Sequence, residues 1–178
     1  VTNGWRGNQL IVLAARPGQG KTQLAIHFAM VAALHSHSSL FFSLEMSAAS
    51  LVDRALVNTS CVDSEAYRNG RLSPDQWQQV TEAGASPTWT GILIDDTPLQ
   101  TVRNIRTKCL LQSRRGKIDM VIIDYLQLIE AGDRKANREQ QVASITRELK
   151  LLSKELEVPV ILLCQLNRDA ENNLGKRP

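Results

Sequence analysis

Short apolar runs alternate with longer amphipathic segments along the whole chain. Five runs have the length and composition of β-strands, and they cover residues 10–14, 40–44, 92–94, 120–124 and 160–164. The fourth run is apolar at consecutive positions, which is typical of a strand covered on both faces. Strands that alternate with helices predict an α/β fold, with a mostly parallel sheet, helices on both faces and right-handed crossovers.

Helix-start signals accompany the amphipathic segments. Ser47, Ser73 and Asn137 can each cap a helix N-terminus, and a proline follows the second of them at the first helical position. Two further helices are expected over about residues 24–34 and 102–115, where apolar side chains recur at helical spacing.

Three expectations concern local detail. Only His27 is polar between residues 24 and 34, so this helix is predicted to be buried on most sides. Residues 59–72 are polar, and residues 84–91 contain proline, glycine and serine. Both of these segments are therefore predicted to be irregular.

Composition limits the class of protein. With 178 residues, 43% of them hydrophobic, the chain can bury one substantial core, and one domain is expected. The net charge of +3 is too small to indicate nucleic-acid binding by itself. Cys61, Cys109 and Cys164 have no paired spacing, which favours reduced thiols over a disulfide framework or a zinc site. No run has membrane-spanning length, so a soluble, cytoplasmic protein without a membrane partner is expected.

The glycine-rich turn at residues 15–22 carries the strongest chemical signal. It lies between an apolar run and a helical segment, which is the context of a phosphate-binding loop. Gly18 and Gly20 permit backbone geometry that points successive N–H groups at an anion, and the following helix adds its positive end. Lys21 is then expected to reach the β- and γ-phosphates, and the Thr22 hydroxyl to bind Mg²⁺.

Polar residues directly after the strands supply further candidates, because ligands of parallel sheets bind at the C-terminal strand ends. Asp124 closes an apolar run, as the Walker B carboxylate that binds Mg²⁺ does. Glu45 is the candidate general base for an attacking water, with a plain surface glutamate as the alternative. Gln165 is suited to contact a γ-phosphate without neutralising it. Asp95 and Asp96 are expected to cap the next helix.

These residues define a predicted site for ATP and Mg²⁺. Its catalytic residues are Glu45, Lys21 and Gln165, and its Mg²⁺ ligands are Thr22 and Asp124. The predicted nucleotide contacts are Arg16, Pro17, Gly18, Gln19, Gly20, Lys21, Thr22, Gln23 and Asp124.

One position departs from the general phosphate-loop pattern. Ala15 stands where that pattern has its first glycine. An alanine is compatible with this place if its φ is negative.

Five segments in order give the chain a specific resemblance. They are Ala-Arg-Pro-Gly-Gln-Gly-Lys-Thr at 15–22, Phe-Phe-Ser-Leu-Glu-Met-Ser at 41–47, Ile-Asp-Asp-Thr-Pro at 94–98, Val-Ile-Ile-Asp-Tyr-Leu-Gln-Leu-Ile at 121–129 and Gln-Leu-Asn-Arg at 165–168. Together they resemble the motor domain of bacterial replicative DNA helicases, the DnaB family, over nearly all of the chain. That family also has alanine at the first glycine position, which accounts for Ala15.

The resemblance implies a RecA-like P-loop NTPase fold within a ring-shaped homo-hexamer. Such a ring hydrolyses ATP at subunit interfaces while it moves along single-stranded DNA and unwinds the duplex. By position, the resemblance implies that Lys21 and Thr22 contact the phosphates and Mg²⁺ and that Glu45 is the catalytic base. It also implies that Asp124 is the Walker B carboxylate and that Gln165 is the γ-phosphate sensor. Primase and a helicase loader are further expected partners.

In RecA-like proteins the loops after the fourth and fifth core strands tend to face DNA. Here these loops are residues 130–138 and 167–178. Their basic residues, expected to contact DNA unless they are simply solvated, are Arg134, Lys135, Arg138, Arg168, Lys176 and Arg177.

The resemblance also implies segments beyond this stretch. Related helicases have a separate N-terminal helical domain and a linker helix, and they continue past Pro178 with further strands, a DNA loop and an arginine finger. Residues 1–178 are therefore expected to be a RecA-like ATPase domain without these parts, and to bind nucleotide but hydrolyse it slowly, since an arginine finger contributes roughly a thousandfold or more. The open alternatives are a RecA- or clock-type ATPase and an ATP-gated helicase-loading adaptor.

Overall fold

The computed structural model describes residues 4–130 and 136–166, and it confirms the predicted α/β class. The strands are β1 (Leu10–Ala15), β2 (Ser39–Ser43), β3 (Ile92–Asp95), β4 (Met120–Asp124) and β5 (Val160–Gln165). The α-helices are α1 (Lys21–Leu34), α2 (Ala48–Ser60), α3 (Ser64–Arg68), α4 (Pro74–Gly84), α5 (Val102–Arg115) and α6 (Arg138–Glu155). Two short 3₁₀-helices are η1 (Pro87–Gly91) and η2 (Leu126–Leu128).

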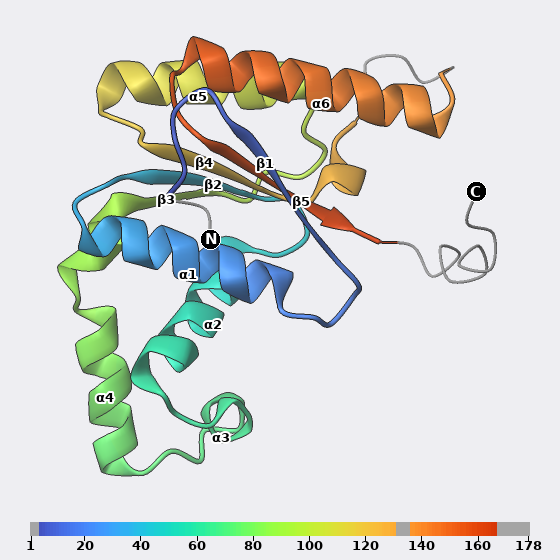
Figure 1. Ribbon diagram of the computed structural model, residues 1–178. Helices are drawn as coiled ribbons and strands as arrows, with labels where there is room; N and C mark the ends of the chain where they lie inside the picture. The colour runs from blue at the N-terminus through green and yellow to red at the C-terminus, as the bar shows by residue number, and fades with distance from the viewer. Residues whose placement is uncertain (1–3, 131–135, 167–178) are drawn as a thin grey trace.

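All strand pairs are parallel, in the order β1-β5-β4-β2-β3. The C-terminal ends of the strands therefore lie along one edge of the sheet (Figure 1). Because β5 lies between β1 and β4, the strand that ends in Gln165 separates the strand before the glycine-rich turn from the strand that ends in Asp124.

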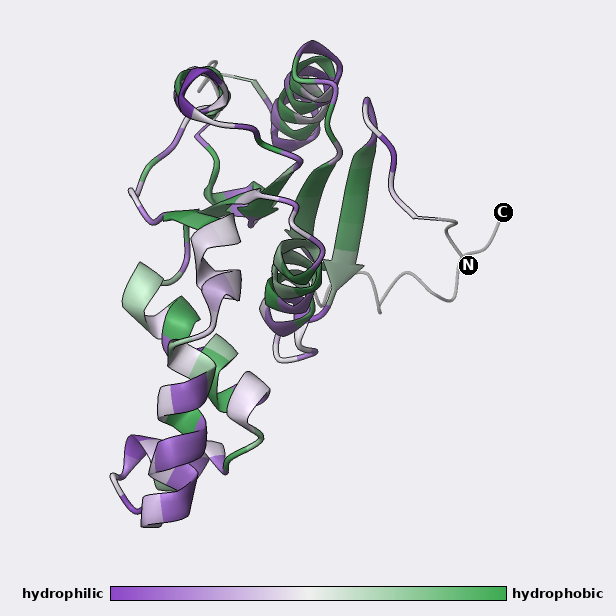
Figure 2. Ribbon diagram, turned by 90° about the vertical axis from the view of Figure 1, so that its left-hand side faces the viewer, coloured by the Kyte–Doolittle hydropathy of each residue, from purple (hydrophilic) through white to green (hydrophobic). Residues whose placement is uncertain are grey.

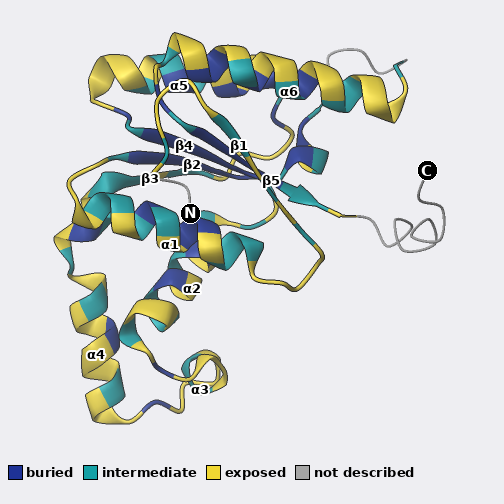
Figure 3. Cartoon of the chain, in the orientation of Figure 1, coloured by how far each residue is buried: buried dark blue, intermediate teal, exposed yellow. Residues whose placement is uncertain are grey.

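Two cores, one on each face, hold the sheet. Phe42, Ile123 and Leu162 pack with α5 and α6, whereas the neighbouring positions pack with α1 and α2 on the other face. The alternation follows from the two-residue period of a strand, which turns successive side chains to opposite faces. Figure 3 shows the central strands buried between the two helical layers. The predicted helices on both faces are confirmed.

Helix α1 is buried on most sides but leaves one stripe exposed. Ala25, Ile26 and Ala29 are buried against the sheet, but Leu24 and Leu34 are 40% and 68% exposed. The exposed residues Leu24, His27, Val31 and Leu34 form one stripe, and the other sides of the helix pack against the sheet, α2 and η1. The predicted burial on most sides is therefore confirmed, with this stripe as the exception.

The segments predicted to be irregular contain helices. Within residues 59–72, α3 forms because the Asp63 side chain accepts a hydrogen bond from Ala66 N at 2.7 Å. Within residues 84–91, η1 follows a serine cap and a proline. Helices this short contain too few residues to show a helical repeat of apolar positions, so the capping residues are their main sequence signal.

Helices α2, α3 and α4 form an extension of the domain beside the sheet. Val62, Leu72 and Val80 make its small core, and the rings of Tyr67 and Trp77 lie 6.0 Å apart. Figure 2 shows this extension reaching away from the sheet, with mostly hydrophilic residues at its far end. No helix within the described ranges is long and apolar enough to cross a membrane.

Candidate nucleotide-hydrolysis site

The glycine-rich turn connects β1 directly to α1. Gly18 and Gly20 have φ angles of 75° and 76°, in the left-handed region that favours glycine. Gly20 is also the N-terminal cap residue of α1, whose first turn has no acidic residue and no side-chain cap. The backbone N–H groups of the turn and the positive end of a 14-residue helix are therefore suited to hold phosphate groups.

Lys21 folds back across the turn. Its Nζ donates to the Ala15 carbonyl at 3.3 Å and lies 5.5 Å from the centroid of the Tyr125 ring. A cation at this distance from a ring face is attracted to it. The lysine ammonium is thus held beside the loop where phosphates would lie.

Thr22 and Asp124 meet across 102 positions of sequence. Thr22 Oγ1 donates to Asp124 Oδ2 at 2.6 Å, and Asp124 is 1% exposed. Burial raises the pKa of Asp124, and the negative charge of Glu45 adds to this rise. The Thr22 hydrogen bond and the positive charges of Lys21 and Arg54 act in the opposite direction. A cation placed here would favour the ionised carboxylate.

One oxygen of the Asp124 carboxylate has no partner among the described residues that would compete with such a cation. This oxygen, Oδ1, is buried. A threonine hydroxyl and a carboxylate are oxygen ligands of the kind Mg²⁺ prefers, and Mg²⁺ commonly takes its remaining ligands from water and substrate phosphates. No group of three or more His, Cys, Asp or Glu side chains that could hold a metal occurs in residues 4–130 and 136–166. The residues present therefore fit Mg²⁺ bound together with a nucleotide, rather than an all-protein metal site.

Glu45 reaches the same edge from β2. Ser43 is in register with Asp124, and Leu44 N donates to the Asp124 carbonyl at 2.8 Å. Ser43 Oγ donates to the Met46 carbonyl at 2.7 Å and shapes the turn around Glu45. Glu45 itself is exposed, so its carboxylate is accessible to water.

Gln165 lies beside the start of the glycine-rich turn. It is in register with Ala15, and Leu166 N donates to the Ala15 carbonyl at 3.1 Å. The same carbonyl accepts from Lys21 Nζ. The parallel sheet thus places the predicted catalytic residues Lys21, Glu45 and Gln165, which follow or end β1, β2 and β5, along the same edge.

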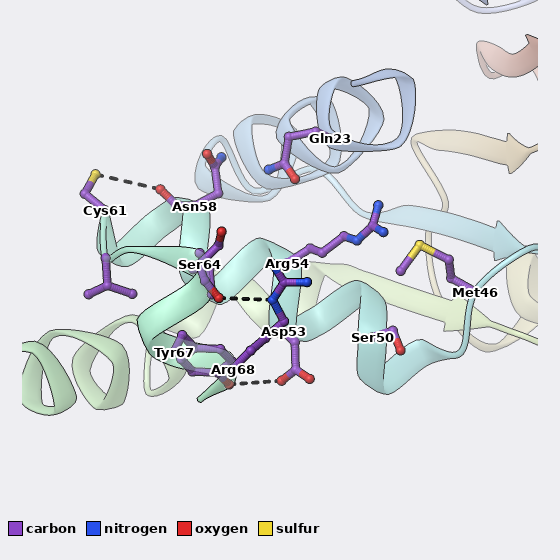
Figure 4. Close-up of a pocket in the computed structure, with 12 residues that line it drawn as sticks. Gln23, Met46, Ser50, Asp53, Arg54, Asn58, Cys61, Ser64, Tyr67 and Arg68 are labelled. Atoms are coloured by element: carbon purple, nitrogen blue, oxygen red, sulfur yellow. Dashed lines mark hydrogen bonds between the residues drawn. The ribbon is translucent and has the colours of Figure 1, made fainter. Parts of the chain in front are cut away.

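The other predicted nucleotide contacts lie on the turn and in the first turn of α1. Arg16, Pro17 and Gln19 are exposed, and Gln19 N donates to the Arg16 carbonyl at 3.4 Å. The Nε2 atom of Gln23 is buried and lacks a partner among the described residues. Gln23 faces a groove of about 760 Å³ between α1, α2 and α3, and Arg54 lies across it (Figure 4).

Three residues near the site were missed by the sequence interpretation. Tyr125 lies under the Lys21 ammonium, and Gln127 bonds to the backbone of Gln165. Both belong to the segment after Asp124, where the resemblance indicates a motif but gives no role to these two residues. Arg54, whose charge acts on Asp124, has no local sequence signal, because its approach depends on how α2 packs.

Asp95 and Asp96 correct a prediction, because neither caps the helix that follows. Asp96 Oδ2 accepts from Ala48 N at 2.7 Å and so caps α2, which precedes it in sequence. Asp95 forms an ion pair with Lys108 at 2.6 Å. The cap of α5 is Thr101. The reason is that β3 lies beside β2, so the β3 end meets the helix that follows β2.

Among the predicted DNA contacts, Arg138 is the one that the structure describes. It begins α6, and its Nη2 donates to the Gln127 carbonyl at 3.4 Å. The others lie outside the described residues, and they are Arg134, Lys135, Arg168, Lys176 and Arg177.

The fold and site together define a RecA-like P-loop ATPase domain. The family model for the DnaB-like helicase C-terminal domain matches residues 1–178, and the chain belongs to this family. The family predicted from the sequence is therefore confirmed.

Relatives and solved structures agree with this assignment. The chain is 44% identical to the replicative DNA helicase DnaB of Geobacillus stearothermophilus and 44% identical to the replicative DNA helicase DnaC of Bacillus subtilis, each over 100% of this chain and 40% of the relative. The structure of a DnaB-like replicative helicase and its interactions with primase gives a TM-score of 0.89 at 30% identity, over 99% of this chain and 43% of that one. A separately solved ATPase domain gives a TM-score of 0.88 at 30% identity, over 98% and 63% of the two chains. The chain thus spans about two fifths of the length of these curated relatives.

Proposed function

We propose that this chain is the ATP-hydrolysing motor domain of a replicative DNA helicase, which couples hydrolysis to movement along single-stranded DNA and duplex unwinding. The observation that carries the proposal is the meeting of Thr22, Asp124 and Gln165 at the glycine-rich turn, within a DnaB-like helicase domain. The relatives of known name are replicative DNA helicases, which supports the same activity.

The chain's own residues would hold the nucleotide in three ways. The N–H groups of the turn and the start of α1 would bind the phosphates, and Lys21 would move from the Ala15 carbonyl toward the β- and γ-phosphates. Thr22 Oγ1 and Asp124 would hold Mg²⁺, which supplies charge neutralisation on the phosphate oxygens.

Glu45 would act on the attacking water. Its carboxylate would accept a proton from the water as the water oxygen bonds to the γ-phosphorus and the bond to the β-phosphate oxygen breaks. Gln165 would contact the γ-phosphate as a neutral hydrogen-bonding group. ADP and inorganic phosphate leave the site.

Single-stranded DNA would bind along the basic residues near the ends of β4 and β5. Arg138 and the basic residues of 131–135 and 167–178 would contact the DNA backbone, giving sequence-independent, salt-dependent binding. A homo-hexameric ring, a primase and a helicase loader are the proposed protein partners. The primase is supported by a structural relative solved for its interactions with primase.

The test uses the complete gene product that carries this domain. We expect ATP hydrolysis that single-stranded DNA stimulates and ATP-dependent unwinding of a forked duplex. Strand pairing without unwinding would favour a RecA-type ATPase. Nucleotide-dependent binding to a helicase, with no stimulation by DNA, would favour a loading adaptor.

A further inference from the structure

We infer that Gln127 is a positioning residue for hydrolysis, which holds the sensor strand in place by bonding to the backbone of Gln165. This inference rests on the proposed function, in which Gln165 contacts the γ-phosphate. Gln127 Nε2 donates to the Gln165 carbonyl at 2.7 Å, and Gln127 Oε1 accepts from Gln165 N at 3.2 Å. Gln127 Nε2 also lies 3.4 Å from Cys164 Sγ.

The strand pairing explains why this contact is needed. The ladder between β4 and β5 ends with Ile123 beside Leu162, whereas the ladder between β1 and β5 continues to Gln165. The N–H and C=O groups of Gln165 both face the β4 side, where the ladder has ended. The carboxamide of Gln127 takes the place of the missing strand there. A backbone group left without a partner would cost stability at this edge.

A primary carboxamide satisfies both groups at once, whereas a carboxylate cannot. Gln165 presents one donor and one acceptor on the same side, and a carboxamide offers the matching acceptor and donor in one plane. The pairing also fixes the orientation of the Gln127 amide, because the opposite orientation would face donor to donor.

The short helix η2 connects this contact to the rest of the site. Leu128 N donates to the Tyr125 carbonyl at 3.1 Å, and the Tyr125 ring lies 5.5 Å from Lys21 Nζ. On its other side, the Gln127 carbonyl accepts from Arg138. The segment after Asp124 thus contacts the phosphate-loop lysine, the sensor strand and the start of α6. Loss of the Gln127 contact should move Gln165 relative to the phosphate loop and slow chemistry rather than binding.

The test combines kinetics with a double-mutant cycle in the complete gene product. Gln127→Leu removes both hydrogen bonds at similar volume and should lower kcat about ten- to a hundredfold, the size of effect expected from a misplacement of about 1 Å. The KM for ATP should stay within about twofold, since the proposed phosphate-binding groups are untouched. In the Gln165→Ala background, Gln127→Leu should have almost no further effect, because two residues that act through one contact are not additive.

A conservative variant and a control complete the design. Gln127→Glu should lose activity at neutral pH, because a carboxylate cannot donate to the Gln165 carbonyl. Its kcat relative to wild type should recover as the pH falls and the acid becomes protonated. Gln78→Leu, an exposed glutamine of α4, should leave kcat unchanged. If the losses from Gln127→Leu and Gln165→Ala multiply, or if Gln127→Leu leaves kcat unchanged, the positioning role is overturned while the proposed function stands. A wild-type protein that does not hydrolyse ATP overturns both.

Discussion

At the scale of single residues, Asp124 lies at the centre of the candidate site. It is buried, one oxygen accepts from Thr22, and the other has no partner among the described residues. An unpartnered buried carboxylate oxygen is costly, and a bound ion is one way to satisfy it. This feature supports the proposal that Asp124 binds Mg²⁺ together with a nucleotide.

Glu45→Gln should separate binding from hydrolysis. The amide keeps the shape of the side chain but cannot take a proton from water, so hydrolysis should fall about a hundredfold to ten-thousandfold while nucleotide affinity is retained. Lys21→Ala should weaken both, because in the proposed mechanism the lysine contacts the phosphates before and during the reaction. Equilibrium binding of a fluorescent ATP analogue and phosphate release measure the two effects. Normal hydrolysis by Glu45→Gln would show that the base is assigned wrongly.

Asp119 should contribute stability that depends on pH. Burial raises its pKa, but hydrogen bonds from Lys117 and from Ser38 N and the nearby charges of Lys117 and His37 outweigh this, so the pKa is lowered overall. A lowered folded pKa means that the contribution is complete above the unfolded value of about 3.9 and is lost as the pH falls through the folded pKa.

Urea unfolding of wild type and Asp119→Asn checks this expectation. The free-energy difference between the two proteins should be constant near neutral pH and shrink below about pH 4. A difference that does not change with acid pH would contradict the assignment.

At the scale of elements, contacts between neighbouring strand ends organise the loops. Ser47, Ser73 and Asn137 cap α2, α4 and α6 as predicted, and the last two form complete capping boxes. The first turn of α2 has a second acceptor in Asp96, which comes from the β3 end. The helix that follows Glu45 is therefore fixed from its own strand and from the neighbouring strand.

Asp96→Ala should destabilise the protein by about 1 kcal/mol through loss of this acceptor. Asp96→Asn keeps an oxygen in the same place and should cost only a few tenths of that value. Chemical denaturation of both variants measures the difference. Equal losses would indicate that charge, rather than the hydrogen bond to Ala48 N, is what matters.

At the scale of the whole molecule, stability comes from one sheet buried between two helical layers. The residues of β4 and most of those of β5 are buried, and the two faces form separate cores. A change in a central strand disturbs a layer and the sheet together, whereas a change on the outer side of a helix disturbs neither.

Leu162→Ala should therefore lower the free energy of unfolding by about 2–5 kcal/mol, because it leaves a cavity between β5 and the α5–α6 layer. The matched control is Leu151→Ala on α6, where the side chain is 58% exposed and the expected change is within about 0.5 kcal/mol. Denaturant unfolding of the two variants gives the comparison. Similar values would mean that Leu151 is covered by something outside the described residues.

Short-range properties of the chain were enough to predict the five strands, the caps of α2, α4 and α6, and the phosphate loop. These properties are runs of apolar residues, Ser or Asn before a helix, and Gly18 and Gly20 at left-handed positions. The resemblance then supplied the family and the order of the motifs. Short helices such as α3 were missed, because five residues contain no period.

Only the tertiary structure shows which strand ends are neighbours. The order β1-β5-β4-β2-β3 places Gln165 beside Ala15, turns Asp96 toward α2 and leaves Gln165 to be bonded by Gln127. The same packing leaves one side of α1 exposed despite its apolar sequence. Local pattern indicates which segments are strands and helices, but contacts between residues far apart in sequence depend on the order in which the strands pair, and no local pattern encodes that order.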